Sequence, residues 1–246
     1  MEKYKGLIII IMLLCILVIF IGLKIEQYKL NLKEIEQYKL FKGRRKITFN
    51  EVRNDKGVYG EFKTFKVFNN YLGENSIIFN SLYLPKENGK FTEVDLIAIT
   101  EKCIFIVEVK NLYGIVTGNK EEKYWTQKLS NSTNEEIYNP IIQNENHIKY
   151  FNRNVDLLKY NLSNKNIYSL IVFGNKSDIK EVRYNEENIK VVNINEVETT
   201  LSEIMNNNST ILKQEQIKEI GEILKKFEDI DSTKREKHIN DILEYN

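Results

Sequence analysis

Two apolar segments separated by three residues constrain the fold of this chain more than any other feature. Residues 93–99 read Glu-Val-Asp-Leu-Ile-Ala-Ile, and residues 103–110 read Cys-Ile-Phe-Ile-Val-Glu-Val-Lys. Such β-branched, apolar runs predict strands, and the short break at residues 100–102 predicts that the two strands pair as a hairpin. Residues 104–107 are apolar at every position, which is typical of a strand buried on both faces.

Each predicted strand also carries an acidic residue. If Glu101 and Lys102 form a two-residue loop, Asp95 lies opposite Glu108; a three-residue loop would shift this register by one. Opposed residues have Cβ atoms about 4.5–5.5 Å apart, and two carboxylates this close repel each other unless a proton or cation intervenes. Lys110 projects from the same face as Glu108. The pattern therefore predicts a site for a hard cation with an ammonium beside it.

A simpler interpretation of these charges is also open. Acids and lysines often pair on the solvent face of an antiparallel hairpin, and such an ion pair needs no function. The continuous apolar run at residues 104–107 argues against it, because charges at the end of a fully buried strand are costly unless they are paired or bind metal.

Composition excludes several other classes of site. The 36 Lys and Arg residues nearly balance the 35 Asp and Glu residues, for a net charge of +1, so any nucleic-acid contact must use a local patch. His147 and His238 are the only histidines, which excludes multi-histidine zinc sites. A nucleophilic pair of Cys103 with His147 is conceivable, but the apolar run around Cys103 favours a place in the core. Cys15 lies in a separate apolar segment, so a disulfide is not expected.

The N-terminus predicts a membrane anchor. Residues 6–23 are uncharged and rich in Ile and Leu, and 18 or more such residues are long enough for a transmembrane helix. We therefore expect residues 1–24 to be an uncleaved, single-pass anchor that contacts the lipid bilayer through residues 6–23, although a buried core helix is an alternative. Basic residues are more numerous after the span than before it, which favours a cytoplasmic C-terminal domain.

Residues 25–50 are expected to form a charged juxtamembrane helix or linker. The hexamer Ile-Glu-Gln-Tyr-Lys-Leu occurs at residues 25–30 and again at 35–40. Two copies are too few for a solenoid, so a solvated stalk is the favoured interpretation and a short coiled coil the alternative.

The rest of the chain predicts a mixed α/β fold, with a central mixed sheet flanked by helices. We expect this domain at residues 51–207 and exposed C-terminal helices at 208–246. Asn88-Gly89 predicts a hairpin turn, and Asn139-Pro140 predicts a helix start. In addition to the hairpin, helices are expected at 56–72, 141–152, 196–205, 211–227 and 234–243, and strands at 76–84, 115–118, 167–173 and 189–194.

Five short motifs, in this order, resemble those of the NERD (nuclease-related) domain, which belongs to the PD-(D/E)XK phosphodiesterase fold with its restriction-endonuclease-like core. Each motif is weak alone, but their order is specific, and the resemblance covers roughly residues 56–195. In place of the fold's Pro-Asp pair this chain has Val94-Asp95, although the acidic residues are retained. The motifs are Gly57-Val58-Tyr59-Gly60-Glu61, Glu93-Val94-Asp95, Glu108-Val109-Lys110-Asn111-Leu112-Tyr113-Gly114, Trp125, and residues 139–148.

The resemblance implies a role for each candidate residue. Asp95 and Glu108 would be ligands of Mg²⁺ or Mn²⁺, which prefer oxygen donors, and Glu61 would be an additional metal-site carboxylate. Lys110 would orient the attacking water and stabilise charge on the phosphate. Gln143 would reach the lysine or the scissile phosphate from the later helix.

Several of these roles have ordinary alternatives. Glu61 is also consistent with an acid in the first turn of a helix, and Gln143 with a solvated amide. His147 follows Gln143 by four residues and shares its helix face, but its role is open because some relatives in the wider fold have tyrosine there. Trp125 is a core residue more often than a base-stacking platform.

The sequence thus predicts a membrane-anchored, magnesium-dependent nuclease acting on nucleic acid, with DNA as the expected polymer. The alternative is a non-catalytic module that binds nucleic acid or a partner at the membrane. Lys120, Lys123 and Lys128 follow the predicted site strands, but a lysine-rich loop is usually only solvated.

Overall fold

The computed structural model describes residues 2–43, 45–87, 89–129 and 133–228, without the side chains of residues 2, 3, 5–9 and 11. The chain divides into two compact units, Met1–Phe49 and Asn50–Asn246. The helix expected at 234–243 and Asn88 of the expected turn lie outside the described residues.

The first unit contains one long helix, α1 (Glu2–Lys42). It includes both the expected membrane span and the repeated hexamers in a single element. Within the described part of the chain, no helix is apolar over enough length to cross a membrane. The expected anchor at residues 6–23 is therefore not confirmed, and several of its side chains lie outside the described set.

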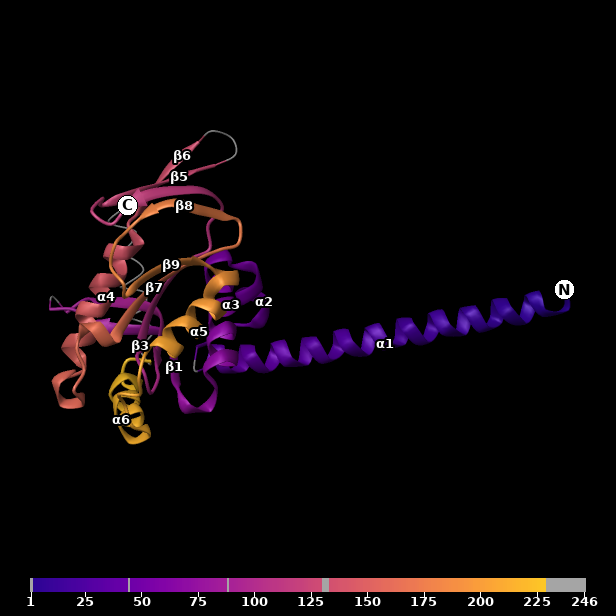
Figure 1. The fold of residues 1–246 in the computed structure, drawn as a ribbon, viewed down its shortest axis with the longest axis horizontal. Helices are drawn as coiled ribbons and strands as arrows, with labels where there is room; N and C mark the ends of the chain where they lie inside the picture. The colour runs from indigo at the N-terminus through magenta and orange to yellow at the C-terminus, as the bar shows by residue number, and fades with distance from the viewer. Residues whose placement is uncertain (1, 44, 88, 130–132, 229–246) are drawn as a thin grey trace. The chain divides into compact units, whose positions relative to one another are not determined.

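The second unit is built around a five-stranded mixed sheet with the order β1-β2-β3-β7-β9 (Figure 1). Strands β1, β2 and β3 pair antiparallel, whereas β3, β7 and β9 pair parallel. This confirms a central mixed sheet. The bounds are β1 (Ile77–Pro85), β2 (Phe91–Ile99), β3 (Ile104–Lys110), β7 (Ile167–Phe173) and β9 (Ile189–Asn193).

The register of the β2–β3 hairpin is the one that a Glu101-Lys102 loop predicts. The backbone N–H of Thr100 donates to Cys103 O at 3.0 Å, and Leu96 is the Cα partner of Val107. Continued by one residue, this register brings Asp95 opposite Glu108, although the paired residues end at Leu96 and Val107. Strand period and loop length therefore predicted the register of the paired part of the hairpin.

Helices cover both faces of this sheet, and successive side chains of β3 point alternately toward one face and the other. Phe105 contacts Phe68 of α3 (Lys56–Leu72) with ring centroids 5.6 Å apart. Ile104 and Ile106 instead join a core with Phe151 of α4 (Pro140–Asn154). α5 (Val197–Asn207) packs against α3. The remaining short helices are α2 (Phe49–Asn54) and 3₁₀ turns at Gly73–Asn75, Leu158–Tyr160, Asn164–Asn166 and Ile194–Glu196.

The C-terminal helix α6 (Gln214–Lys225) is not the exposed helix that the sequence predicts. Its side chains Ile217, Ile220 and Leu224 are buried in the same core as α4. Their spacing of three and four residues forms one apolar stripe, and α6 contacts β1 and β2 through it. The stripe predicts an amphipathic helix, but its docking partner lies more than 100 residues earlier in the chain.

A second sheet, absent from the sequence prediction, has the order β6-β5-β4-β8 (Figure 1). Its outer strands are polar and mostly exposed, so they lack the apolar signal of a buried strand. Trp125 is buried in the core beneath this sheet and stacks on Phe173 of β7, which confirms a structural place for it. The bounds are β4 (Gly114–Asn119), β5 (Tyr124–Lys128), β6 (Asn134–Tyr138) and β8 (Ser177–Arg183).

Candidate functional site

Asp95 lies where β2 and β3 separate. The backbone pairing of the two strands ends at Leu96 and Val107. Beyond that point, the N–H of Val109 donates to Asp95 Oδ2 at 2.7 Å. No described residue donates a hydrogen bond to the other carboxylate oxygen, so Asp95 offers Oδ1 to a ligand.

Glu108 is the most deeply buried acid of the site, with 2% of its surface exposed. Lys110 Nζ lies 2.7 Å from Oε1, and His147 Nε2 lies 3.1 Å from Oε2. Burial favours the neutral carboxyl, but the Lys110 ammonium and the His147 hydrogen bond outweigh it and lower the pKa of Glu108. Glu108 is therefore a carboxylate with a partner on each oxygen.

Lys110 is held between strand and helix. Besides its ion pair with Glu108, its ammonium donates to Gln143 Oε1 at 3.0 Å. Burial opposes the charge on this ammonium, but Glu108 and then Asp95 outweigh that effect and raise the pKa of Lys110. The lysine is thus charged at neutral pH, and two of its three N–H groups are in use.

Helix α4 presents Gln143 and His147 to β3 from consecutive turns. The helix begins at Pro140 and is capped by Asn139, whose side chain accepts from the N–H groups of Ile141 and Ile142. The structure thus brings the sequence-predicted Gln143 to Lys110 and places His147 on Glu108. His147, whose role the sequence left open, is therefore a direct neighbour of the acid.

Two further residues support this arrangement, and neither was assigned a role from the sequence. Thr92 Oγ1 lies 3.1 Å from Nδ1 of His147. Because the Glu108 carboxylate can only accept, Nε2 of His147 carries the proton that it donates. Asn144 is buried and donates to Ile106 O at 2.7 Å and to Ser169 Oγ at 2.9 Å, which ties α4 to β3 and β7. Neither residue had a clear signal in the sequence, because Thr92 is followed by Glu93 and Asn144 lies between Gln143 and Glu145.

The carboxylates of the site disfavour each other's charge. Burial, the negative charge of Glu108 and that of Glu61 together raise the pKa of Asp95 well above its ordinary value of 3.8, against the opposing effects of Val109 N–H and Lys110. Glu61 is half-buried on α3, so its charge reaches the site from the opposite helix. Glu108 and Asp95 therefore share the Lys110 ammonium, and the charge of Glu61 acts on Asp95 as well.

The carboxylates of the site fit a magnesium ion only if two of them serve as its protein ligands. In the described part of the chain, no three His, Cys, Asp or Glu side chains form a group that could hold a metal ion. Magnesium, however, commonly takes one or two carboxylates and completes its octahedron with waters and substrate phosphates. Asp95 and Glu108 can supply that pair, while the contacts of Glu108 to Lys110 and His147 explain why the acids do not converge further.

Other sequence candidates lie outside this site. Cys103 is fully buried at the hairpin, and burial raises the pKa of its thiol to about 12, so it does not pair with His147. Lys120 is paired with Glu145 and Glu186. Neither residue is an available nucleophile or phosphate ligand.

Comparison with known proteins gives a family match for part of the chain. Residues 56–174 match the family described as "Nuclease-related domain" (NERD). The chain is also 30% identical over 94 residues to an uncharacterized protein of Bacillus anthracis; the match covers 38% of this chain and less than half, 44%, of that protein.

Among solved structures, the small subunit of the heterodimeric restriction endonuclease R.BspD6I aligns with 80% of this chain and 95% of its own, at 16% identity. The TM-score of 0.29 is too low to establish a shared fold.

Proposed function

Because residues 56–174 form a nuclease-related domain, we propose that this protein hydrolyses phosphodiester bonds of nucleic acid with the help of Mg²⁺ or Mn²⁺. DNA is the expected polymer. The reaction is assigned to the site where β2 and β3 separate, formed by Asp95, Glu108 and Lys110 with Gln143 and Glu61.

The observation that carries this proposal is the geometry where β2 and β3 separate: Val109 N–H donates to Asp95 Oδ2 at 2.7 Å, and Lys110 Nζ lies 2.7 Å from Oε1 of the buried Glu108. In addition, burial and the charges of Glu108 and Glu61 raise the pKa of Asp95, so ionisation of Asp95 beside these carboxylates is unfavourable. A divalent cation removes that repulsion. A purely structural ion pair would need only Glu108 and Lys110.

Asp95 and Glu108 would hold the ion, with Glu61 as a further carboxylate nearby. When bound, such an ion polarises the phosphoryl oxygen and lowers the pKa of a coordinated water. His147 orients the carboxylate of Glu108 through its Nε2–H, and Thr92 fixes the ring through Nδ1.

The ammonium of Lys110 is the group that would face the phosphate. Glu108 and Gln143 occupy two of its donors, and the third can stabilise the charge that develops on a phosphoryl oxygen. Gln143 accepts from Lys110 through Oε1, so its amide N–H groups can donate to the same phosphate.

The test is cleavage by the full-length chain of labelled single- and double-stranded DNA and RNA, with Mg²⁺, Mn²⁺ or EDTA. We expect metal-dependent cleavage that Asp95→Asn and Glu108→Gln abolish. Glu101→Gln is the matched control, because it neutralises an acid at the opposite end of the same hairpin. Full activity in both site variants would refute the assignment. No cleavage of any polymer by the folded protein would instead favour a non-catalytic binding module.

Membrane attachment is proposed separately, through residues 6–23, with the domain after α1 on the cytoplasmic side. Its support is the uncharged sequence of that segment and the exposed apolar side chains of α1, among them Leu13, Leu17 and Phe20. Flotation of the full chain with phosphatidylcholine vesicles should be lost when residues 1–24 are removed. Equal flotation of both chains, or of neither, would contradict the proposal.

A further inference from the structure

A cleft of about 560 Å³ opens at the carboxyl ends of the parallel strands β3 and β7. In open α/β sheets this edge is where ligands commonly bind. The first residues of α3 and the loops that follow the two strands form its walls. The lining includes Lys56 and Lys63 of α3, Asn111 and Tyr113 after β3, and Asn175 and Lys176 after β7.

The charge of the cleft is entirely positive. It is lined by Lys56, Lys63 and Lys176 and by no acidic side chain, and none of the three ammonium groups forms an ion pair with a described carboxylate. Burial lowers the pKa of Lys63, as expected for an ammonium that lacks a counter-ion. Three lysines without ion pairs around one cleft are suited to binding a polyanion.

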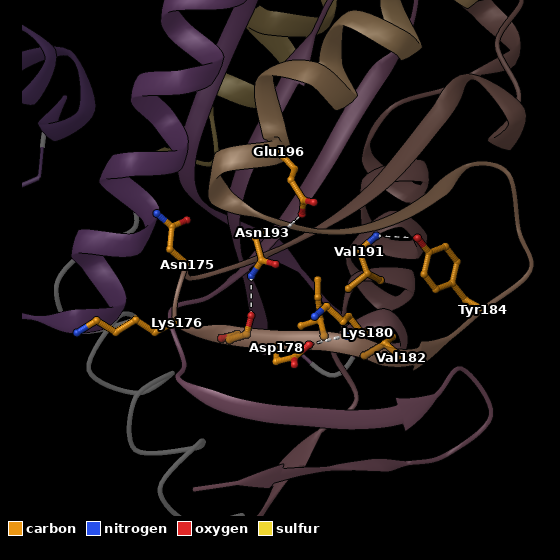
Figure 2. A pocket seen from close by; sticks show the side chains of 11 residues that line it. Asn175, Lys176, Asp178, Lys180, Val182, Tyr184, Val191, Asn193 and Glu196 are labelled. Atoms are coloured by element: carbon orange, nitrogen blue, oxygen red, sulfur yellow. Dashed lines mark hydrogen bonds between the residues drawn. The ribbon is translucent and has the colours of Figure 1, made fainter. Parts of the chain in front are cut away.

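A neighbouring cavity of about 580 Å³ shows that this charge is not a general property of the region (Figure 2). It shares Lys176 with the cleft, but Asp178 and Glu196 also line it. In Figure 2 the Lys176 side chain points away from the other residues that line this cavity. The positive charge is therefore concentrated on the side of α3 and the loop after β3.

An aromatic ring is exposed on the same surface. Tyr113 is 47% exposed, and the ammonium of Lys56 lies 5.8 Å from its ring centroid. Successive bases of single-stranded nucleic acid stack on exposed aromatic rings beside positive charge, largely independently of sequence. In a duplex, the faces of interior bases are covered by their neighbours.

The walls of the cleft are held together by direct contacts. Asn111 Nδ2 donates to Lys56 O at 2.6 Å, which joins the loop after β3 to the start of α3. The two elements also approach closely at Gly60, where an added Cβ would lie 2.7 Å from Asn111 Cβ. The loop that carries Tyr113 is therefore held directly against the helix that carries Lys56 and Lys63.

Residues that line the cleft also lie next to candidate active-site residues in the sequence. Asn111 directly follows Lys110 at the end of β3, and Glu61 lies on α3 between Lys56 and Lys63. Helix α3 thus carries both Glu61 and two of the lysines, and the chain after β3 leads directly from Lys110 into the cleft.

We propose that this cleft binds a single-stranded segment of nucleic acid leading into the active site, with Lys56, Lys63 and Lys176 on its phosphates and Tyr113 stacked on a base. The inference rests on the proposed nuclease function and specifies its substrate as a single strand or an unpaired end.

Binding is tested with the full-length protein in EDTA, so that metal-dependent cleavage does not occur. The probes are a fluorescent 20-nucleotide DNA of mixed sequence and its duplex, and anisotropy is the readout. We expect tighter binding of the single strand. Tyr113→Ala should weaken it roughly 5- to 150-fold, whereas Tyr113→Phe should bind like the wild type.

The lysines are tested by salt dependence. Lys63→Ala/Lys176→Ala should weaken binding and reduce the slope of log K against log salt by about 0.7 for each phosphate that the variant no longer neutralises. Lys180→Ala/Lys218→Ala makes the same charge change at exposed positions outside the cleft and should leave affinity and slope unchanged. Preference for the duplex, or wild-type binding by both cleft variants, would overturn the inference.

Failure of this inference can be separated from failure of the proposed catalysis. Glu108→Gln should retain single-strand binding while losing cleavage. If the wild type cuts no polymer but binds the single strand through Tyr113 and the lysines, the cleft assignment stands and the catalytic one falls. If the wild type cuts nucleic acid and the cleft variants bind and cut equally well, only the cleft assignment falls.

Discussion

Replacing Lys110 with methionine should destabilise the protein as well as inactivate it. Methionine preserves much of the side-chain length but removes the ammonium that lies 2.7 Å from Glu108 Oε1. The Glu108 side chain is only 3% exposed, so water cannot replace the missing partner. Removing one member of a buried ion pair leaves an uncompensated charge and typically costs 3–5 kcal/mol.

The structure places this variant near the lower end of that range. The Lys110 side chain is 24% exposed, so the pair is not fully desolvated, and Glu108 keeps its hydrogen bond to His147. We expect the free energy of unfolding to fall by about 3 kcal/mol for Lys110→Met. Glu108→Gln should cost less, about 1–2 kcal/mol, because Lys110 retains Gln143 and access to solvent.

A double-mutant cycle measures the coupling. Urea unfolding of the full chain can be followed through Trp125, the single tryptophan, which is buried. The double variant Glu108→Gln/Lys110→Met should lose less stability than the sum of the single variants, by about 1–3 kcal/mol.

Lys218→Met, at an exposed position on α6, is the control and should change stability by less than about 0.5 kcal/mol. Additive single effects, or a loss below about 0.5 kcal/mol for Lys110→Met, would refute the idea that Lys110 sustains the charge of Glu108. Loss of cleavage in this variant is informative only in urea-free buffer at a temperature where it is fully folded.

Three further predictions follow from the same structural features. The pKa of Asp95 in the folded protein lies above its ordinary 3.8. Between the ordinary pKa and the raised pKa, the folded protein holds a proton on Asp95 that the unfolded chain has lost. The free energy of unfolding therefore falls as pH rises through this window. Asp95→Asn should therefore be stabilised relative to the wild type above that window in metal-free urea titrations; equal pH profiles would contradict this. Gly60→Ala should lower the free energy of unfolding by about 1–3 kcal/mol, because the new Cβ would lie 2.7 Å from Asn111 Cβ, whereas Gly57→Ala meets only a side-chain oxygen at 3.3 Å and should be tolerated in the same measurement. Cys103, buried and with its pKa raised to about 12, should resist iodoacetamide at neutral pH in a chain whose other cysteine is replaced; rapid labelling of the folded protein would disprove its burial.

Local features of the sequence were sufficient for the hairpin and for several helices. A two-residue loop predicted the observed register of the hairpin, in which Leu96 pairs with Val107 and Asp95 and Glu108 are the next residues. Asn139 and Pro140 marked the start of α4, and the helix expected at 56–72 has the bounds of α3. These outcomes depend on interactions within a few residues, which sequence spacing reports directly.

Contacts between distant segments were decided by the tertiary structure. The pairing of Glu108 with His147 requires α4 to dock on β3, which the buried amide of Asn144 helps to fix. Thr92 joins that contact from β2, 55 residues before His147. The spacing of residues in the sequence does not predict contacts between segments this far apart.

The remaining differences have the same physical origin. The polar strands β6 and β8 carry no apolar pattern of their own and become strands by pairing with β5 and β4. The amphipathic stripe of α6 predicts a buried face but not the strands that cover it. The sequence by itself thus determined the chemistry of the acids and lysine and their local register, because these follow from backbone geometry. Only the tertiary structure determined which helix orients them, because the contacts of Glu108 and Lys110 with α4 depend on how distant apolar faces pack.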